Sequence, residues 1–453
     1  MKTSVVLILF LCCCCQISLA QPTSVKLENI KVDAPFEMPE ITIPNFANLP
    51  NYDIRNYGAI AGDKEKITHA IETAIEKATQ QGGTVVIPTG EWLTKKIHLK
   101  SNVNLHISEG ATLLFSADPK DYLPAVFSTW EGLECYNYSP LIYAFGIKNI
   151  AITGKGTIKA QMDVWRKWFP RPQAHMESIK NLYNWAQDGV PVENRNMVND
   201  TSNLRPQFVQ FNRCENILIE DIKIRNSPFW TVHLYLSKNI VVRNIDVYAH
   251  GHNNDGIDPE MSQNILIENC VFDQGDDAVA IKSGRNPEGW RLQTPSKNIV
   301  IRNCTMKDGH QLLAIGSELS GGIENILVEN CEAGVGAKLM HLLFIKTNER
   351  MGGYVKNVYF KNIKAHDLRD GILGIDTDVL YQWRTLVPTR IKKTTPIQNV
   401  YLENIVTTNG KFISKINGNP SEPVKNILLK NVQLENASED KNQHKFVEGF
   451  QIQ

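Results

Sequence analysis

The sequence lacks an excess of charge of either sign. Its 453 residues carry 48 Lys and Arg against 48 Asp and Glu, so the formal net charge is zero. Global charge therefore gives no argument for binding nucleic acid or a membrane surface, and any polyanion must be recognised locally. After residue 20 the chain also lacks the run of about 18 apolar residues that a membrane-spanning helix needs, so we expect no transmembrane segment.

The main repeat of the chain is not followed by an amphipathic helix in any of its copies. The repeat reads Asn, aliphatic, any residue, aliphatic, any residue, Asn or Asp, and then an apolar residue. Period-two alternation is typical of a short strand with one buried face, and Asn suits the tight turns at its ends. The copies are NILIEDI (216–222), NIVVRNI (239–245), NILIENC (264–270), NIVIRNC (298–304), NILVENC (325–331), NVYFKNI (357–363), NVYLENI (399–405) and NILLKNV (426–432).

Strands and turns that repeat every 23 to 42 residues predict an all-β fold, a parallel β-helix whose coils bury their apolar rows against one another. Such a solenoid grows along one axis, so we expect residues 51–453 to form a single domain. A second row supports this interpretation. AVAIKSG, LLAIGSE, LLFIKTN and ILGIDTD align Ile281, Ile315, Ile345 and Ile375, so each coil contributes at least two strands.

Several polar residues fall in phase with this second row. Asp276 and His310 each lie five residues before the aligned isoleucine of their coil. They should therefore be neighbours on adjacent coils, about 4.8 Å apart. Lys282 and Lys346 each follow their isoleucine by one residue, which points them away from the core, toward solvent.

Cysteine is too sparse to suggest a disulfide framework. Four of the nine cysteines lie in the run Cys12 to Cys15, which leaves an odd number. Cys270, Cys304 and Cys331 occupy the last repeat position, where other copies have isoleucine. We therefore expect a stack of small buried residues. A metal site is disfavoured because that register contains no histidine or carboxylate.

The first 82 residues differ from the rest. Residues 1–20 have the charged start, apolar centre and small-residue cleavage site of a signal peptide, which predicts an extracytoplasmic protein, secreted or periplasmic. Bulky residues before Cys12 argue against lipoprotein anchoring. Residues 21–50 are rich in proline and polar groups and predict an N-terminal arm or linker. An apolar stripe between Asp63 and Gly82 predicts a helix that covers the first coil.

Between about Tyr52 and Ile405 the chain carries, in order, YGAIAGD, GGTVVIPTGEW, IHLKSNVNLHISEGATLLF, ITGKGTI, NSPFW, NNDGID, GDDAVAIKSG, DGH and IKTN. Together these strings resemble glycoside hydrolase family 28, the polygalacturonase family, and most of all its exo-acting secreted members. The resemblance implies a right-handed parallel β-helix. It also implies an enzyme that hydrolyses α-1,4-linked galacturonate in pectic poly- or oligosaccharides with inversion, without a metal or another cofactor.

The resemblance also implies roles for individual residues. Asp255 matches the aspartate of the family's NTD motif, Asp276 and Asp277 its paired aspartates, His310 its GHG histidine and Lys346 its RIK lysine. Inversion needs one protonated carboxyl and another that activates water. By resemblance Asp276 is the general acid, while Asp255 and Asp277 hold the water.

Crowded carboxylates repel one another, which raises at least one pKa and keeps a proton available. His310 could hydrogen-bond Asp276 and tune its proton affinity. Lys346 and Lys282 would bind the sugar carboxylate, and Asn253 belongs to the same substrate-binding set.

Two positions depart from the family pattern. Phe344 stands where the family has the arginine of RIK, and Gln311 replaces the last glycine of GHG. Without that guanidinium, we expect the subsite either to be less selective for galacturonate or to use another cation, such as Arg205, Arg285 or Arg350. Alternation from Ile345 puts Phe344 on the outer face with Lys346. An apolar ring there would suit rhamnogalacturonan or xylogalacturonan as alternative substrates.

A long insertion bears on the cleavage mode. Residues 130–200 include the aromatic-rich runs WEGLECYNYSP and VWRKWFPRP. Such a loop could close one end of the site and favour exo-action, although it could also be an extension without substrate contact.

Three classes of function stay open, and in each we expect a monomer. The first is a pectin hydrolase. The second is a β-helical pectate lyase, for which Asp255, Asp276 and Asp277 could hold calcium but no arginine base lies beside them. The third is a carbohydrate-binding protein without activity.

Overall fold

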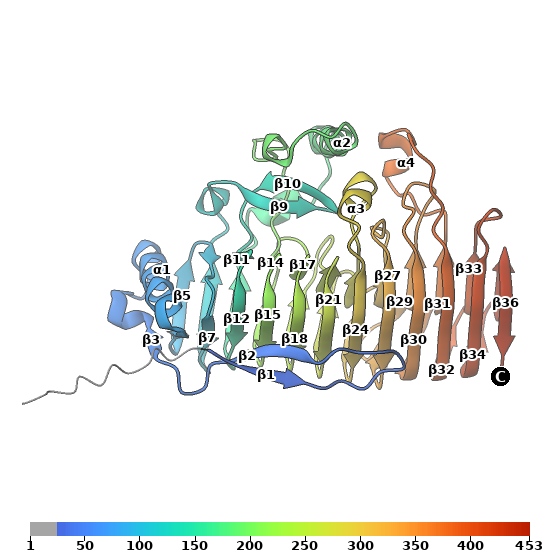
Figure 1. Ribbon diagram of the computed structural model, residues 1–453, viewed down its shortest axis with the longest axis horizontal. Coiled ribbons are helices and arrows are strands. Elements are labelled where there is room, and N and C mark those ends of the chain that lie inside the picture. Colours follow the sequence, from blue (N-terminus) through green and yellow to red (C-terminus); the bar gives the residue numbers. More distant parts are fainter. Residues whose placement is uncertain (1–24) are drawn as a thin grey trace, which may run out of the picture.

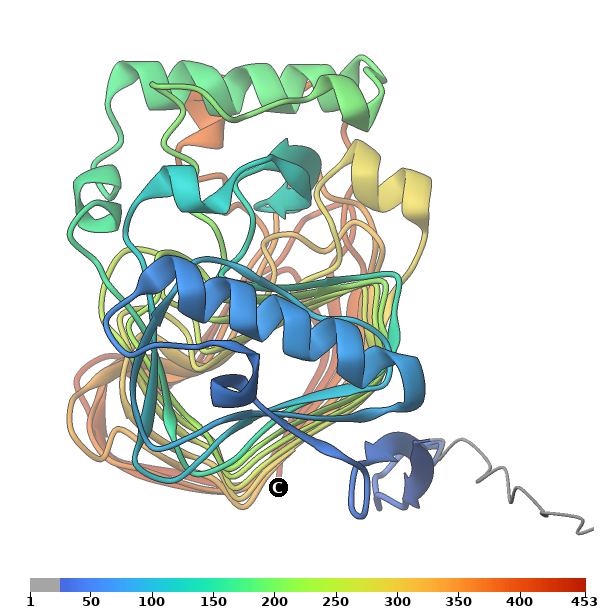
Figure 2. The ribbon, with the colours of Figure 1, turned by 90° about the vertical axis from the view of Figure 1, so that its left-hand side faces the viewer.

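The computed structural model describes residues 25–453, which form a right-handed parallel β-helix (Figure 1). Figure 2 looks along the helix axis, where successive coils superimpose. The predicted fold class is therefore confirmed. The proposed signal peptide and the Cys12 to Cys15 run lie outside the described residues. Within residues 25–453, no helix is both long and apolar enough to cross a membrane.

One sheet has 11 parallel strands and carries the polar residues singled out in the sequence. Its strands are β6 (Ile97–His98), β11 (Ile142–Phe145), β14 (Val209–Asn212), β17 (Val232–Tyr235), β20 (Ile257–Glu260), β23 (Val279–Ile281), β26 (Gln311–Ile315), β29 (Leu339–Lys346), β31 (Leu368–Asp376), β33 (Phe412–Asn417) and β35 (Asn442–Lys445).

The other sheet has 21 strands and contains the Asn-flanked repeat. Its strands are β3 (Asn51–Asp53), β4 (Gly83–Ile87), β5 (Gly90–Thr94), β7 (Val103–Ile107), β8 (Ala111–Phe115), β12 (Lys148–Thr153), β13 (Thr157–Ala160), β15 (Glu215–Glu220), β16 (Lys223–Arg225), β18 (Lys238–Arg243), β19 (Asp246–Ala249), β21 (Gln263–Glu268), β22 (Val271–Gln274), β24 (Ser296–Arg302), β25 (Thr305–Asp308), β27 (Ile323–Glu329), β28 (Glu332–Ala333), β30 (Val355–Ala365), β32 (Ile397–Gly410), β34 (Val424–Ala437) and β36 (Val447–Ile452).

The core between the sheets is a set of aligned apolar rows. Ile281 pairs in register with Ile315, Ile315 with Ile345, and Ile345 with Ile375. All four are buried. The predicted second row is therefore confirmed, and alternate residues of these strands must face outward.

The turns of the large sheet are held by amide ladders. Asn264 donates to Asn239, Asn298 to Asn264, and Asn325 to Asn298, at 3.0 to 3.3 Å between Nδ2 and Oδ1. These residues have positive φ, for example 57° at Asn298. Asn tolerates this left-handed conformation better than other non-glycine residues, which explains why it recurs at the ends of the repeat.

The first coil is covered by α1 (Lys64–Gln81). Asp63 caps the helix by accepting a hydrogen bond from the backbone of Lys66 at 3.1 Å, and Ile67, Ile71 and Ile75 are buried. Figure 2 shows this helix across the end of the coils. The helix predicted to begin at Asp63 and to cover the first coil is confirmed.

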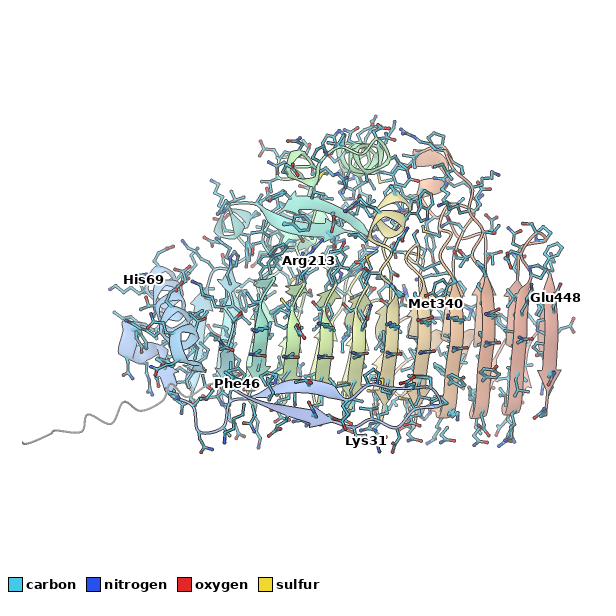
Figure 3. The ribbon with its side chains drawn as sticks, viewed as in Figure 1. Lys31, Phe46, His69, Arg213, Met340 and Glu448 are labelled. Carbon is cyan, nitrogen blue, oxygen red and sulfur yellow. The ribbon has the colours of Figure 1, made fainter. Side chains whose placement is uncertain are left out.

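Residues 25–50 form an ordered arm rather than a structureless linker. Its strands β1 (Lys26–Ile30) and β2 (Ile41–Asn45) pair antiparallel and run along the large sheet (Figure 1). Ile41 and Ile43 are buried in a cluster with outward-facing apolar residues of that sheet, such as Val241 and Leu266. Figure 3 shows Lys31 and Phe46 on this arm.

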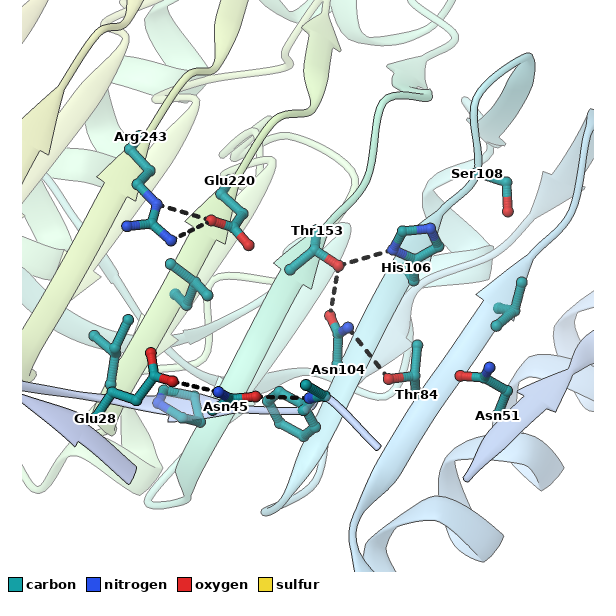
Figure 4. Close-up of a pocket in the computed structure, with 16 residues that line it drawn as sticks. Glu28, Asn45, Asn51, Thr84, Asn104, His106, Ser108, Thr153, Glu220 and Arg243 are labelled. Carbon is teal, nitrogen blue, oxygen red and sulfur yellow. Dashed lines mark hydrogen bonds and ion pairs between the residues drawn. The ribbon is translucent and has the colours of Figure 1, made fainter. Parts of the chain in front are cut away.

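A hollow of about 600 Å³ lies between the arm and the large sheet (Figure 4). A chain of hydrogen bonds crosses it from His106 to Thr153, Asn104 and Thr84. None of its lining residues belongs to the predicted site.

Two insertions fold together above the 11-stranded sheet. The first contains β9 (Val126–Trp130), β10 (Leu133–Asn137) and α2 (Gln173–Gln187), and the second contains α4 (Trp383–Leu386). Trp130, Leu182, Phe229 and Trp383 share one buried cluster. The first insertion is interrupted by β11, β12 and β13, which belong to the coils, so we call residues 126–137, 161–204 and 380–387 the roof. Figure 1 shows it above the middle coils, beside α3 (Pro287–Leu292), while β33 and β36 stand beyond it.

The cysteines bear out the predicted stack. Cys270, Cys304 and Cys331 are buried with free thiols, and the backbone N–H of Cys304 lies 3.4 Å from the Cys331 sulfur. Burial raises the pKa of the Cys304 thiol, so these residues act as apolar packing groups.

The cap should contribute measurably to stability. Replacing fully buried Ile71 with Ala (Ile71→Ala) should cost about 2 to 5 kcal/mol because it leaves a cavity against the first coil. Thermal and urea unfolding of the variant measure the loss. Exposed Lys77 on the same helix is the matched control, and Lys77→Ala should leave the midpoint unchanged. Equal midpoints for the two variants would contradict the role of α1.

Candidate active site

The 11-stranded sheet gathers the predicted residues because their strands are consecutive neighbours. Asp255 precedes β20, Asp276 and Asp277 precede β23, and His310 precedes β26. Lys346 ends β29. Stacking of these coils brings residues 91 positions apart in the chain into one cavity of about 410 Å³.

The cavity is lined by the sheet below and the roof above. Its walls include Glu131, Arg171, Trp230, His252, Asn253, Asp255, Asp276, Asp277, Lys282, Arg285, His310, Gln311, Gly316, Ser317, Glu318, Met340, His341, Phe344, Lys346, Tyr381, Gln382 and Trp383. We call it the central cavity. The predicted site residues lie here, apart from Arg205.

His310 and Asp276 form the pair expected from their shared register. Nδ1 of His310 lies 2.9 Å from Oδ1 of Asp276, and the His310 backbone donates to the Asp276 carbonyl at 2.9 Å. The hydrogen bond to Asp276 raises the pKa of His310. Burial acts to raise the pKa of Asp276, but the hydrogen bond and charge of His310, with Lys346 and Lys282, lower it below its ordinary value.

Asp255 and Asp258 form a second pair of carboxyls. The pKa of each is raised, as their crowding predicts. Burial and the charge of Asp276 raise the pKa of Asp255 to about 7. Burial and the charge of Asp255 raise the pKa of Asp258 well above its ordinary range. Asp258 follows Asp255 in the DGID string, so this pair of carboxyls is where a proton is retained as the pH falls below about 7.

Lys282 differs from the sequence expectation. Its side chain leaves the core as predicted, but the residue is only 4% exposed and not in solvent. Its Nζ lies 3.4 Å from Asp255, 3.5 Å from Asp258 and 3.9 Å from Glu318. Trp230 covers it, with the ring centroid 4.6 Å from Nζ. The charge of Lys282 is therefore used to balance buried carboxylates.

Lys346 remains closer to the cavity surface. Its Nζ lies 3.4 Å from Oδ2 of Asp277, and its side chain is 14% exposed. Burial acts to lower the pKa of Lys346, but Asp277 and its neighbours outweigh this and raise it. Burial raises the pKa of Asp277 in spite of Lys346.

The arginines suggested as substitutes for the family's RIK arginine are already occupied. Arg205 is buried, donates to the carbonyls of Pro228 and His252, and holds Asn253 at 3.1 Å. Arg285 contacts Glu318, and Arg350 donates to Thr389 and to the Trp383 carbonyl. These contacts make Arg205 a support for the Asn253 loop.

Sequence reasoning missed Arg171. It belongs to the roof, lines the central cavity, is partly exposed and donates to Asn253 at 3.2 Å. Glu318 and Glu131, which were also missed, pair with buried Arg285. Arg171 and Glu131 lie outside the repeats, and Glu318 ends the LLAIGSE string, where the neighbouring copies have Gly284 and Asn348, so no recurring residue type marked them.

Phe344 faces outward beside Lys346, as alternation predicted. It lines the central cavity and stacks on His341 with ring centroids 4.8 Å apart and an interplanar angle of 10°. Burial lowers the pKa of His341 to about 4, so the imidazole is neutral. The departure from the family pattern therefore creates a flat, uncharged surface.

Among residues 25–453, two groups could offer clustered metal ligands. They are Asp276 with Asp277 and His310, whose ligand atoms lie within 4.8 Å of one another, and His250 with Asp273 and Asp308. In the first group, Nδ1 of His310 is already within hydrogen-bonding distance of Asp276.

Fold and site together define a class, namely a β-helix enzyme with a histidine-paired carboxyl and further buried carboxyls for acid–base chemistry. The family model "Glycosyl hydrolases family 28" matches residues 82–449. The chain belongs to this family and is a glycoside hydrolase.

Named relatives agree with the family. A probable polygalacturonase of Vitis vinifera is 28% identical over 85% of this chain and 74% of its own length. An exo-poly-alpha-D-galacturonosidase of Dickeya chrysanthemi is 27% identical over 70% of this chain and 55% of its own. The crystal structure of an exopolygalacturonase from Thermotoga maritima matches with a TM-score of 0.81 and 36% identity, covering 91% of this chain and 92% of that one.

The retained proton should shape the pH dependence of stability. Because the pKa of Asp255 is about 7 in the folded protein against an ordinary 3.8, its protonation stabilises the fold at acidic pH. This contribution is lost as the pH rises through about 7. Asp255→Asn should reduce the fall in unfolding midpoint between pH 5 and pH 8 by roughly 2 °C.

Thermal scans across that pH range test this expectation. The matched control is Asp163→Asn, which removes an exposed carboxylate and should leave the pH dependence unchanged. An Asp255→Asn variant with the wild-type pH profile would show that the proton lies elsewhere.

Proposed function

We propose that the protein is an exo-acting polygalacturonase that hydrolyses α-1,4-linked galacturonate with inversion. The observation that carries this proposal is the Asp276–His310 pair, which shares one cavity with Asp255, Asp277 and Lys346. Support also comes from the exopolygalacturonase that is 36% identical over 91% of the chain.

The acid role falls to Asp276 acting with His310. A carboxyl with a lowered pKa is a poor proton store by itself, but a protonated imidazole 2.9 Å away keeps one proton in the pair. When the glycosidic oxygen approaches, the proton can pass to Asp276 and then to the leaving oxygen. Proton transfer of this kind typically contributes about 10² to 10⁴-fold in rate.

The base role falls to Asp255 and Asp277, which hold the attacking water. Each has one buried oxygen without a hydrogen-bond partner in the described residues, Oδ1 in both cases. A raised pKa makes each a stronger base once it is ionised. Lys282 and Lys346 lie 3.4 Å from these carboxylates and favour their ionised forms.

Lys346 is the leading candidate to bind the galacturonate carboxylate. It lines the cavity and keeps part of its side chain exposed. Arg171 at the roof side is a second cation for the same chemistry. The His341–Phe344 stack favours an uncharged sugar face nearby, which keeps rhamnogalacturonan and xylogalacturonan as the second candidate substrates.

Exo-action is supported by the roof. Glu131 and Arg171 from one insertion and Tyr381 and Trp383 from the other border the central cavity. Their shared apolar cluster makes the roof a packed structure rather than a free loop. A roof of this kind would block passage of a long chain and favour binding of a chain end. Together with the signal-peptide pattern, the substrate implies action outside the cytoplasm.

Loss of the acid should remove hydrolysis without unfolding the protein. Asp276→Asn should lower kcat on oligogalacturonides by about 10³-fold, because Asn cannot donate a carboxyl proton. Reducing-end release measures the rate, and ultraviolet absorbance detects the unsaturated product of a lyase. Asp273→Asn, at the half-exposed carboxylate three residues earlier, is the control and should retain activity. Normal hydrolysis by Asp276→Asn would reject the acid assignment, and calcium-dependent unsaturated product would indicate a lyase.

Exo-action predicts one product size from the first minutes of digestion. Polygalacturonan should lose chain ends while its viscosity falls slowly, because internal bonds are not cut. Chromatography of early products beside viscometry measures both. A ladder of intermediate oligomers would contradict exo-action, and faster release from xylogalacturonan or rhamnogalacturonan than from homogalacturonan would reassign the substrate.

A further inference from the structure

The N-terminal arm ends over a polar patch of the large sheet. Along β2 the arm covers outward-facing apolar residues of that sheet, such as Leu266 and Val300. Where the arm ends, at residues 45–51, the sheet instead presents Asn104 and His106 of β7. The arm and this patch border the hollow of about 600 Å³ shown in Figure 4, which we call the arm hollow. It lies on the other sheet from the central cavity and shares none of its lining residues.

Strand register brings the polar groups of the patch together. Thr84 on β4 pairs with Asn104 on β7, and His106 on β7 pairs with Thr153 on β12. Thr84, Asn104 and Thr153 are buried, and His106 is half-buried. Three adjacent coils therefore present hydroxyl, amide and imidazole groups on one outward face.

The hydrogen bonds within the patch determine which groups can still donate or accept. The Thr153 hydroxyl donates to Oδ1 of Asn104 at 3.0 Å, so it accepts from Nδ1 of His106, which is 3.0 Å away. Burial lowers the pKa of His106, so the imidazole is neutral and its Nε2 is an acceptor. Asn104 donates to the Thr84 hydroxyl at 3.3 Å. The hydrogen of that hydroxyl is left to donate.

Further polar groups border the arm hollow and are unused by its other walls. Among the residues drawn in Figure 4, Asn51 and Ser108 make no hydrogen bond with one another or with the rest. His106 contacts this set through Nδ1 alone. The arm hollow therefore offers a hydroxyl donor, an imidazole acceptor, a second hydroxyl and an amide to a ligand.

The charges around the arm hollow exclude an anionic ligand. Arg243 is the one Lys or Arg among the described residues that line it, and its guanidinium is paired with Glu220 at 2.7 and 2.8 Å. Glu28 on the arm adds a carboxylate, which accepts from the side-chain amide of Asn45. A carboxylate or phosphate would find no free cation here and two acidic neighbours. One carboxylate outside an ion pair also gives too few oxygen ligands for a hard cation.

An uncharged sugar has the chemistry that remains. Each sugar hydroxyl both donates and accepts, so adjacent hydroxyls can meet the Thr84 donor and the His106 acceptor together. Phe46 and Leu218 add apolar surface for the C–H face of a pyranose. The volume lies within the range of about 300 to 1,000 Å³ that is typical of small-ligand sites.

We propose that the arm hollow is a second carbohydrate site, which binds a neutral pyranose through His106, Thr84 and Ser108 of the sheet, with Asn51 and Phe46 at its arm side. The proposal goes beyond the proposed function and does not rest on it. A neutral sugar held here leaves the central cavity free for its own substrate. Because the sugar would contact both the arm and the sheet, its binding should also hold the arm in place.

Galactose and galacturonate are the matched probes, since they differ only at C6. Calorimetry with the full-length protein measures their affinity, and hydrogen–deuterium exchange locates them. Galactose should protect residues 43–51 and 104–108, whereas galacturonate should not. His106→Ala should weaken galactose binding roughly tenfold, as expected for one lost hydrogen bond. His69→Ala removes an imidazole from α1, away from the arm hollow (Figure 3), and should change nothing.

Ser108→Ala is a second variant that leaves the buried hydrogen-bond chain intact. It should weaken galactose binding in the same direction and keeps the test decisive if His106→Ala fails to fold. Galactose that does not bind, that protects only the central cavity, or that binds both variants as tightly as wild type would overturn the proposal and leave a water-filled hollow. Tighter binding of galacturonate than of galactose at residues 104–108 would overturn the neutral ligand class. Oligogalacturonide hydrolysis is measured separately, so neither result decides the proposed function.

Discussion

The structure depends on the in-register stacking of coils by parallel backbone hydrogen bonds. Each residue of one coil is held about 4.8 Å from its counterpart on the next, so a residue type repeated at one register position becomes a row in space. The buried isoleucines and the Asn ladders are two such rows. The active-site groups are a third case, in which the same rule places different side chains side by side.

The stacking of coils explains why the site residues lie close together, and the burial of their side chains then shifts their pKa values. Five carboxyl groups, Asp255, Asp258, Asp276, Asp277 and Glu318, lie at one end of the central cavity or beneath it, and each is buried enough to disfavour its charge. Lys282, Lys346 and His310 are placed among them and contribute the opposing charge. The pKa of Asp276 falls and that of Asp255 rises because the cations are shared unequally. Under the proposed roles, Asp276 with its lowered pKa depends on His310 for the proton that it donates, and Asp255 with its raised pKa is the stronger base once it is ionised.

The sequence was sufficient to predict whatever obeyed the repeat. The strands, the aligned isoleucines, the cysteine stack, the capping helix and the Asp276–His310 contact all follow from period and register. Two kinds of feature could not be predicted. They are the site residues that the insertions contribute and the burial of side chains that face outward from the coils. Arg171 and Glu131 come from the roof, whose path no period describes. Lys282 was expected in solvent because strand alternation predicts only that its side chain points away from the core. That Trp230 covers this side chain depends on tertiary packing, which alternation does not describe.

The replacement of a cation by Phe344 illustrates how such a fold can vary its specificity. Changing one outward residue alters the surface of one coil and leaves the backbone ladder intact, since ladder bonds are made by main-chain atoms. Here the altered coil is followed by a glycine at the same register position, and the ring occupies the space above it. The arginine of the family's pattern is thus exchanged for a flat apolar side chain. The nearest lysine in that row, Lys415, lies two coils further along the axis, so the charge of the row changes from coil to coil while the backbone ladder that holds the active-site groups stays the same.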